Sequence, residues 1–276
     1  MLKLHVFHLG NLKLDANLLV QETAVSTLDQ PDIPNYMVEF PVPAFLLETD
    51  EGLILFDTGC HPDAMLPGDQ GRWPYAFQRR VPWDGGEKTT VMYYLKQLGI
   101  SPDDINTIIL SHMHNDHAGC VEFFPKAKFI VAEAEFSACL KAYAMHRYMS
   151  SYIWKDTDTW TKMNLNWSLL DREDGDIQVA KGVTILNLGP GHAPGMLALK
   201  VDLENQGSVI LASDCLYNKN NYEKLIGPGI CYDSRGWLRT AKTLKKIASE
   251  SEASVWYGHD AEQFSTLRSG YTDFYD

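Results

Sequence analysis

The segment Leu110–Gly119, with the sequence LSHMHNDHAG, constrains the fold more than any other part of the chain. It places three histidines and one aspartate within six residues, namely His112, His114, Asp116 and His117. Imidazoles and a carboxylate crowded on one turn would repel and desolvate one another without a cation between them. The cluster therefore predicts a metal site, and the chain has to fold so that further ligands can reach it.

Composition limits the classes of protein that can carry this site. The chain has 276 residues, of which 45% are hydrophobic and 22% charged, as in globular proteins with a full core. Its net charge of −12 repels phosphate backbones and argues against nucleic acid as a substrate. No apolar run approaches membrane-spanning length. Five scattered cysteines without a CxxC motif, and a start that lacks the features of a secretory signal, favour a reduced protein of the cytoplasm.

Hydrophobic periodicity predicts alternating groups of strands and helices. Residues 62–85, rich in Pro and Gly, are expected to form a long ordered loop. A helix is expected over 133–154 with an apolar stripe through Phe136, Leu140, Tyr143 and Met145, and another from Ser234, its expected N-cap. The other expected elements are strands at 3–9, 44–49, 53–59, 106–111, 128–132 and 253–260, a strand over 182–192, a hairpin over 197–214 and a helix over 88–98. The pattern predicts one α/β domain, residues 1–276, with two similar halves.

Polar residues follow four of these strands at their carboxyl ends. They are His112 after NTIILS, His192 shortly after VTILNL, Asp214 after SVILAS and His259 after ASVWYG. Ligand sites of open α/β sheets gather beyond the carboxyl ends of strands. We therefore expect the four ends to meet at one edge.

The candidate ligand set has seven members, which are His112, His114, Asp116, His117, His192, Asp214 and His259. His112 and His114 are two residues apart on an extended segment, so both can face one ion. Seven nitrogen and oxygen ligands are too many for one tetrahedral ion and suit two. Imidazoles mixed with carboxylates favour zinc, although manganese, iron and cobalt accept the same ligand types.

Other polar residues have weaker claims to a role in the site. Asp57 could accept a hydrogen bond from a ligand imidazole or could simply occupy a turn. Strand alternation turns Cys215 away from Asp214 and predicts a buried structural thiol. The other four histidines are expected to be ordinary surface or core residues, namely His5, His8, His61 and His146.

The motifs HMHNDH, GPGHAPG, ASD, YGHD and FDTG, at these separations, resemble those of the metallo-β-lactamase-fold hydrolases over nearly the whole chain. The resemblance implies a four-layer αβ/βα sandwich with a dinuclear metal site at one edge of two mixed sheets. Within the superfamily, the chain is most similar to N-acyl homoserine lactone lactonases and related small-lactone hydrolases. These enzymes carry a tyrosine three residues after the bridging aspartate, as Tyr217 follows Asp214 here.

The resemblance also implies a role for each residue. His112, His114 and His192 would hold one metal ion, Asp116, His117 and His259 would hold the other, and Asp214 would bridge them. A hydroxide between two divalent ions would then attack the lactone carbonyl to give a hydroxy acid. Tyr217 would hydrogen-bond the carbonyl or the leaving oxygen, and Asp116 or a water would pass the proton on.

Two positions depart from the lactonase pattern. Asn115 stands where these enzymes usually have an apolar or aromatic residue, and Met196 stands where many have a second histidine. Both departures concern acyl-chain specificity. The alternatives on the same scaffold are a thioester hydrolase of the glyoxalase II kind, a β-lactamase, and an amide or phosphodiester hydrolase. Flavodiiron redox chemistry, disfavoured by a histidine at position 114, and a non-catalytic metal-stabilised binding protein are the remaining alternatives.

Two stretches are rich in aromatic residues and methionine. They could line an apolar pocket for a small lactone or ester substrate, or form the face of a homodimer. Helical spacing in the second stretch favours packing over substrate contact. The residues are Trp73, Tyr75, Phe77 and Trp83 in the first stretch, and Met145, Tyr148, Met149, Tyr152 and Trp154 in the second.

Overall fold

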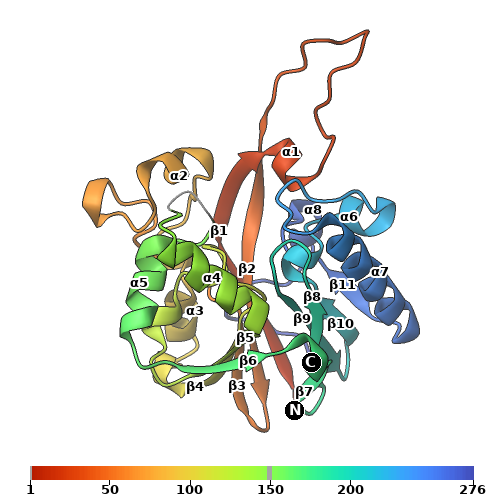
Figure 1. Ribbon diagram of the computed structural model, residues 1–276. Helices are drawn as coiled ribbons and strands as arrows, with labels where there is room; N and C mark the ends of the chain where they lie inside the picture. The colour runs from red at the N-terminus through yellow and green to blue at the C-terminus, as the bar shows by residue number, and fades with distance from the viewer. Residues whose placement is uncertain (1, 148–150) are drawn as a thin grey trace.

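Two mixed β-sheets form the centre of the computed structural model, which describes residues 2–147 and 151–276 (Figure 1). The six-stranded sheet has the order β1-β2-β3-β4-β5-β6, and the five-stranded sheet the order β11-β10-β9-β8-β7. The strands of the first are β1 (Lys3–Asp15), β2 (Met37–Thr49), β3 (Gly52–Phe56), β4 (Ile105–Ile109), β5 (Lys128–Ala132) and β6 (Asn166–Leu170). Those of the second are β7 (Ile177–Ala180), β8 (Val183–Gly189), β9 (Met196–Leu203), β10 (Gly207–Leu211) and β11 (Ser254–Trp256).

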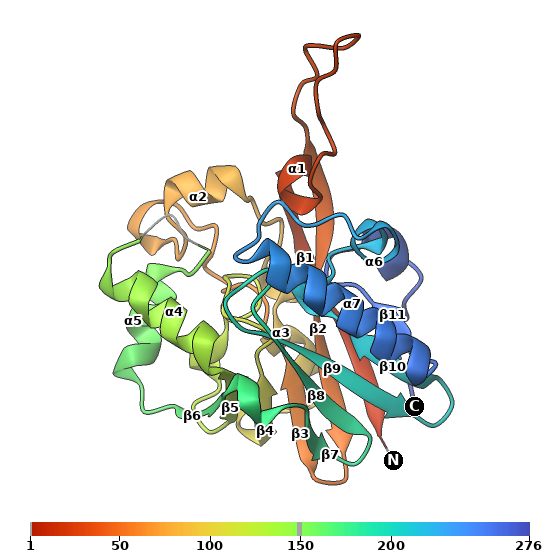
Figure 2. The same cartoon turned by 45° about the vertical axis from the view of Figure 1, so that its right-hand side comes forward.

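Helices cover the outer face of each sheet (Figure 2). The helices are α1 (Ala16–Leu19), α2 (Tyr75–Arg80), α3 (Val91–Gln97), α4 (Glu133–Ala144), α5 (Trp154–Lys162), α6 (Lys219–Lys224), α7 (Ser234–Glu250) and α8 (Ala261–Phe264). One apolar cluster, which includes Phe45, Ile109 and Leu199, lies between the sheets. A second packs the six-stranded sheet against its helices, and a third packs Trp237 and Leu244 of α7 against the other sheet. The two sheets pack face to face and helices cover each outer face, so the predicted four-layer αβ/βα sandwich is confirmed.

The strand pairing explains why the site lies at one edge. β3, β4, β5 and β6 are parallel, so the loops after β3 and β4 leave the sheet at the same end. β10 and β11 are also parallel in the second sheet. The hairpin predicted over 197–214 is present as the antiparallel pair β9 and β10. Polar residues after β4, β8, β10 and β11 are thereby brought to a common edge.

Several predicted elements differ from the structure. The expected helix over 133–154 ends at Ala144, and a separate helix α5 begins at Trp154; the intervening part lies partly outside the described residues. The expected loop over 62–85 contains α2. Asp233, not Ser234, is the N-cap of α7, because its carboxylate accepts from the backbone N–H of Arg235. Within the described ranges, no helix combines the length and apolar character needed to cross a bilayer.

Candidate metal centre

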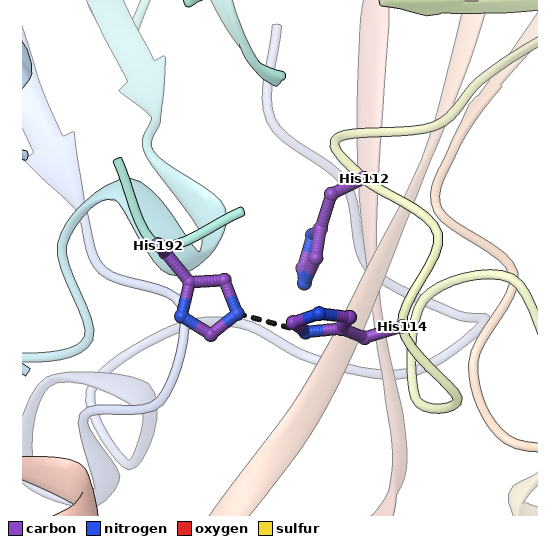
Figure 3. A group of neighbouring side chains, drawn as sticks. All are labelled: His112, His114 and His192. Atoms are coloured by element: carbon purple, nitrogen blue, oxygen red, sulfur yellow. Dashed lines mark hydrogen bonds between the residues drawn. The ribbon is translucent and has the colours of Figure 1, made fainter. Parts of the chain in front are cut away.

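All seven predicted ligands converge at the edge where the loops after β4, β8, β10 and β11 meet. Each of these residues is between 0% and 9% exposed. The ligands form three groups, and within each group all the ligand atoms lie within 4.8 Å of one another. Asp116, His117 and His259 form one of these groups. A second group is His112, His114 and His192, whose rings converge nearly at right angles to one another in Figure 3. The third consists of His112, His117 and Asp214 and joins the other two.

Hydrogen bonds on the far side of the rings fix how the imidazoles face the centre. Nδ1 of His192 donates to the carbonyl oxygen of Ile230 at 2.9 Å, and Nδ1 of His259 donates to that of Pro41 at 2.8 Å. A carbonyl oxygen can only accept, so both protons lie on Nδ1 and both Nε2 atoms present lone pairs. Nδ1 of His117 lies 2.8 Å from the carboxylate of Asp57. These rings are therefore oriented as metal ligands usually are.

Asp214 lies at the middle of the cluster. Its Oδ1 is 3.0 Å from Nε2 of His259 and 3.2 Å from Nε2 of His117. Its Oδ2 is 3.3 Å from Nε2 of His192 and 3.7 Å from Nε2 of His112. One carboxylate thus faces imidazoles of both outer groups, which is the arrangement that a bridging ligand requires.

The donor set fits divalent cations. Three buried atoms that point into the centre have no hydrogen-bond partner, namely Nε2 of His112, Nε2 of His117 and Oδ1 of Asp214. Nε2 of His192 and Nδ1 of His114 lie 2.9 Å apart, the contact drawn in Figure 3. Buried polar atoms without partners are costly, and a cation at this point would satisfy them.

The protonation of His112, His114 and Asp214 agrees with metal binding. Burial, aided by the neighbouring imidazoles, lowers the pKa of His112 well below its usual value and that of His114 to about 3. Burial acts to raise the pKa of Asp214, but the imidazoles of His259 and His117 outweigh it and hold that pKa well below the ordinary value. Burial also acts to lower the pKa of His117 and of His259, but the carboxylates of Asp214 and Asp116 outweigh it and raise both values. Neutral imidazoles and an ionised carboxylate are the forms that bind metal ions.

A set of hydroxyl groups and one carboxylate supports the ligands from behind. Asp57 accepts from the backbone N–H of Ser111 at 2.7 Å and from its hydroxyl at 2.8 Å, in addition to contacting His117. The hydroxyl of Ser213 donates to that of Ser111 at 2.9 Å. Asp57 has φ of 62°, a left-handed conformation that a non-glycine residue rarely adopts. The carboxylate thus both shapes the turn and orients a ligand ring, which combines the two roles considered for it from sequence.

Tyr217 reaches the same centre from the loop after β10. Its side chain is 3% exposed, and its hydroxyl lies 3.0 Å from Nδ1 of His192. It lines a narrow pocket together with Asn115, Asp116 and Asp214. Apolar side chains also line this pocket, and they are Leu12, Leu14, Leu19, Phe40, Phe77, Val81 and Ile230. A second cavity of about 380 Å³ shares His114 and His192 with the first and extends between α4 and the loop that carries Cys231 and Tyr232.

Several residues singled out in the sequence have other places. Met196 is fully buried in the core under α7, so it lines neither cavity. Cys215 lies in the same core cluster, as predicted. His5, His8 and His61 hydrogen-bond Glu48, Asn11 and Glu122 instead of entering the centre.

The aromatic stretches divide between the core, the surface and the pocket. Trp73 and Trp83 belong to the core, Phe77 lines the first pocket, and Tyr75 is exposed. Tyr152 lines the larger cavity. Met145 is exposed, contrary to its expected place in the apolar stripe of α4. Tyr148 and Met149 lie outside the described residues.

Sequence reasoning missed the buried carboxyl group of Glu135. The buried face of α4 consists of Glu135, Cys139 and Ala142, not the predicted stripe through Phe136 and Leu140. The spacing of these three residues is helical, but a carboxylate is not counted as apolar. A search for small or polar residues at helical spacing would have found this face.

The sequence is similar to that of one superfamily and of proteins with known activities. The model of the metallo-β-lactamase superfamily matches residues 37–259. The N-acyl homoserine lactonase AiiB of Agrobacterium fabrum (strain C58) is 39% identical over 279 residues, covering 99% of each chain. An N-acyl homoserine lactonase of Bacillus thuringiensis is 33% identical over 246 residues, covering 88% of this chain and 90% of the relative.

A solved structure is also similar to this chain in its fold. It is an N-acyl homoserine lactone hydrolase with the product N-hexanoyl-L-homoserine bound at its catalytic metal centre. The TM-score is 0.81 at 30% sequence identity, and the match covers 99% of this chain and 98% of that one.

Proposed function

The chain belongs to the metallo-β-lactamase superfamily, and we propose that it is a metal-dependent hydrolase that opens the ring of N-acyl homoserine lactones. The observation that carries the proposal is the convergence of seven nitrogen and oxygen donors at one edge of the sheets, where five of the donor residues line a pocket together with Tyr217. Water adds to the ester carbonyl, the ring C–O bond breaks, and a carboxylate, a hydroxyl group and one released proton result.

Two divalent ions would occupy the centre. Its imidazole and carboxylate ligands favour Zn²⁺. His112, His114 and His192 would hold one ion, Asp116, His117 and His259 would hold the other, and Asp214 would bridge them. The grouping of the ligand atoms and the central place of Asp214 support this assignment. When bound, such ions polarise an ester carbonyl and lower the pKa of water, so that hydrolysis proceeds near neutral pH.

Two side chains of the protein would act on the substrate. The hydroxyl of Tyr217 is positioned to donate a hydrogen bond to the carbonyl or the leaving oxygen of the ring, where negative charge develops. Burial raises the pKa of Tyr217 well above its ordinary value, so the hydroxyl keeps its proton. The carboxylate of Asp116 lies between His117 and His259 at the pocket wall and would pass a proton to the leaving oxygen.

The pocket would bind the acyl chain of the substrate on its apolar wall. Leu12 and Leu14 of β1, Leu19 of α1 and Phe40 of β2 line that wall. Asn115 is a buried lining residue of the same pocket and places an amide group there, whose Nδ2 has no hydrogen-bond partner. An amide at this position suits a substrate that carries a carbonyl oxygen near the ring.

The proposal extends to location and assembly. All five cysteines are free, which supports a reducing compartment, and we assign the protein to the cytoplasm.

We treat residues 1–276 as one domain, because the site draws its ligands from both halves of the chain. The exposed segment 21–36, which projects from the molecule in Figures 1 and 2, supports a homodimer and is considered in the Discussion.

A pH-indicator assay tests the activity. The metal-loaded protein is mixed with N-acyl homoserine lactones of several chain lengths, with other lactones, with nitrocefin and with S-lactoylglutathione. We expect acid release from the acyl homoserine lactones and its loss after chelation of the metal. Turnover of the β-lactam or the thioester with none of any lactone would reject the proposal in favour of another hydrolase on this scaffold. About two metal ions per active chain are expected from elemental analysis.

A further inference from the structure

A buried carboxyl group lies directly behind the metal centre. Glu135 belongs to the first turn of α4, and its side chain is fully buried. The amino terminus of a helix favours a negative charge, but it does not explain why the side chain points inward. The neighbouring Glu133, in the same turn, is exposed.

The carboxyl group joins the two loops that carry histidine ligands. Oε1 accepts from the backbone N–H of Met113 at 2.9 Å, and Oε2 accepts from that of Gly195 at 3.4 Å. Met113 lies between His112 and His114, and Gly195 lies three residues after His192. One side chain therefore contacts the main chain beside all three histidines of the first metal group.

Close packing holds the loop with His192 against this carboxyl group. A Cβ atom at Gly195 would lie 2.6 Å from Cβ of Ala132 and 3.2 Å from Cβ of Glu135. The glycine lets the backbone N–H approach the carboxylate with no side chain between them. The loop consequently rests directly on the start of α4.

The hydroxyl of Tyr152 is a third hydrogen-bond donor to Glu135. The ring of Tyr152 packs against the imidazole of His114, with centroids 5.1 Å apart. Glu135 thus also fixes the aromatic ring that supports His114 from the side of the larger cavity.

We propose that Glu135 is a positioning residue that sets the distance between His114 and His192 and thereby the affinity for the metal ion they share. The inference rests on the proposed metal site but not on the choice of substrate. The atoms concerned are the ring nitrogens of these two histidines, 2.9 Å apart. Loss of the clamp would let the two loops move separately and weaken that group of ligands more than the group with Asp116 and His259.

The test compares Glu135→Gln with Glu133→Gln, which makes the same substitution on the same helix at an exposed position. Both proteins are loaded with Zn²⁺ and titrated against a coloured chelator, and both are loaded with Co²⁺ for absorption spectra. We expect Glu135→Gln to weaken one of the two metal-binding steps by about tenfold or more and to change the cobalt bands. Glu133→Gln should match the unchanged protein in both measurements.

A purely structural role predicts a different result. Glu135→Gln would then lower the unfolding midpoint while the metal affinities and the cobalt spectrum stayed unchanged, and this outcome would overturn the inference. Should Glu135→Gln not fold, Gly195→Ala moves the loop with His192 away from Glu135, because its Cβ would lie 2.6 Å from that of Ala132. Unchanged affinity for the metal in this variant would likewise reject the proposal. Metal titration needs no substrate, so failure of the lactonase assay leaves this test intact.

Discussion

At the scale of the residue, the orientation of each ligand ring depends on the atom it contacts on its far side. Backbone carbonyl groups orient His192 and His259, whereas Asp57 orients His117. Each of these contacts comes from a segment distant in sequence, such as Pro41 for His259. Sequence spacing therefore identifies the ligands, but the tautomer of each depends on tertiary contacts.

Tyr217→Phe tests the hydroxyl that is proposed to act on the substrate. Loss of one hydrogen-bond donor to developing negative charge should reduce kcat by about 100-fold and change KM little. Steady-state kinetics with one acyl homoserine lactone measure the effect. Tyr222→Phe, on α6 and outside the pocket, is the control and should keep full activity. Equal kcat values for Tyr217→Phe and the unchanged protein would remove the hydroxyl from the reaction.

The rate at which the cysteine thiols are labelled at different pH values tests how far they are buried. Four cysteines are buried, and only Cys231 is partly exposed. Burial raises the pKa of Cys231 above the ordinary thiol value and raises that of Cys139 to about 12. The reactive thiolate is then the minor form below pH 9, so the labelling rate should rise about tenfold per pH unit between pH 7 and 9.

A coloured disulfide reagent measures this reaction. We expect one thiol per chain to react in the native protein and five after denaturation. Cys231→Ala should abolish the native reaction. A labelling rate that levels off below pH 9, or a second thiol that reacts in Cys231→Ala, would contradict the burial described for these side chains.

At the scale of the element, the site depends on two loops that contact each other through their backbones. The backbone N–H of Thr58 donates to the carbonyl oxygen of His117 at 2.7 Å, and that of Gly119 donates to Gly59 at 2.9 Å. A Cβ atom at Gly119 would overlap backbone atoms of Gly59, His61 and Asn115. The loop after β3 thus holds the loop after β4 in place.

Gly119→Ala should separate these loops. Backbone atoms cannot move aside as a flexible side chain can, so we expect a loss of about 1–3 kcal/mol in the free energy of unfolding. Denaturant unfolding of the metal-loaded protein measures it. Gly86→Ala is the matched control, because its Cβ would meet no atom within 4 Å. Equal stability of the two variants would show that the loops are not packed as described.

The same scale shows what the sequence could and could not predict. Apolar strands followed by a histidine or an aspartate predicted the edge of the sheets at which the ligands meet, because strand direction alone decides that placement. The strand β6 was missed because its half-exposed sequence NWSLL lacks alternation. The end of α4 at Ala144 was missed because the apolar residues continue beyond it. Glu135 escaped notice because a glutamate in the first turn of a helix is ordinarily a surface residue.

At the scale of the whole molecule, the segment 21–36 between α1 and β2 stands apart from the rest. Nearly all its side chains are exposed, including Val25 and Leu28, and Figures 1 and 2 show it extending away from the sheets. Reciprocal backbone bonds between Thr27 and Gln30 close its tip. We call this segment the arm. An ordered segment with exposed apolar residues loses conformational entropy without burying surface, unless another molecule covers it.

In the proposed homodimer a second copy of this chain would cover the arm, and the charges of the two surfaces support this arrangement. The arm carries Glu22, Asp29 and Asp32 and no basic residue. α2 lies at the same end of the molecule and presents Arg79 and Arg80 to solvent, beside the exposed ring of Tyr75. In a twofold dimer, the arm of each protomer would contact α2 of its partner, so that the same two surfaces are used twice. The interface would adjoin the pocket beside the metal centre, because Phe77 of α2 lines that pocket.

Charge reversal tests this dimer. Light scattering coupled to gel filtration should give the mass of two chains for the unchanged protein at low ionic strength, with more dissociation as salt is added. Replacing Glu22, Asp29 and Asp32 by lysine should give monomers, as should replacing Arg79 and Arg80 by glutamate, since each change sets like charges opposite one another. The combined variant restores opposite charges and should dimerise again. A monomeric unchanged protein, or dimers that persist in both separate variants, would exclude the arm as the interface.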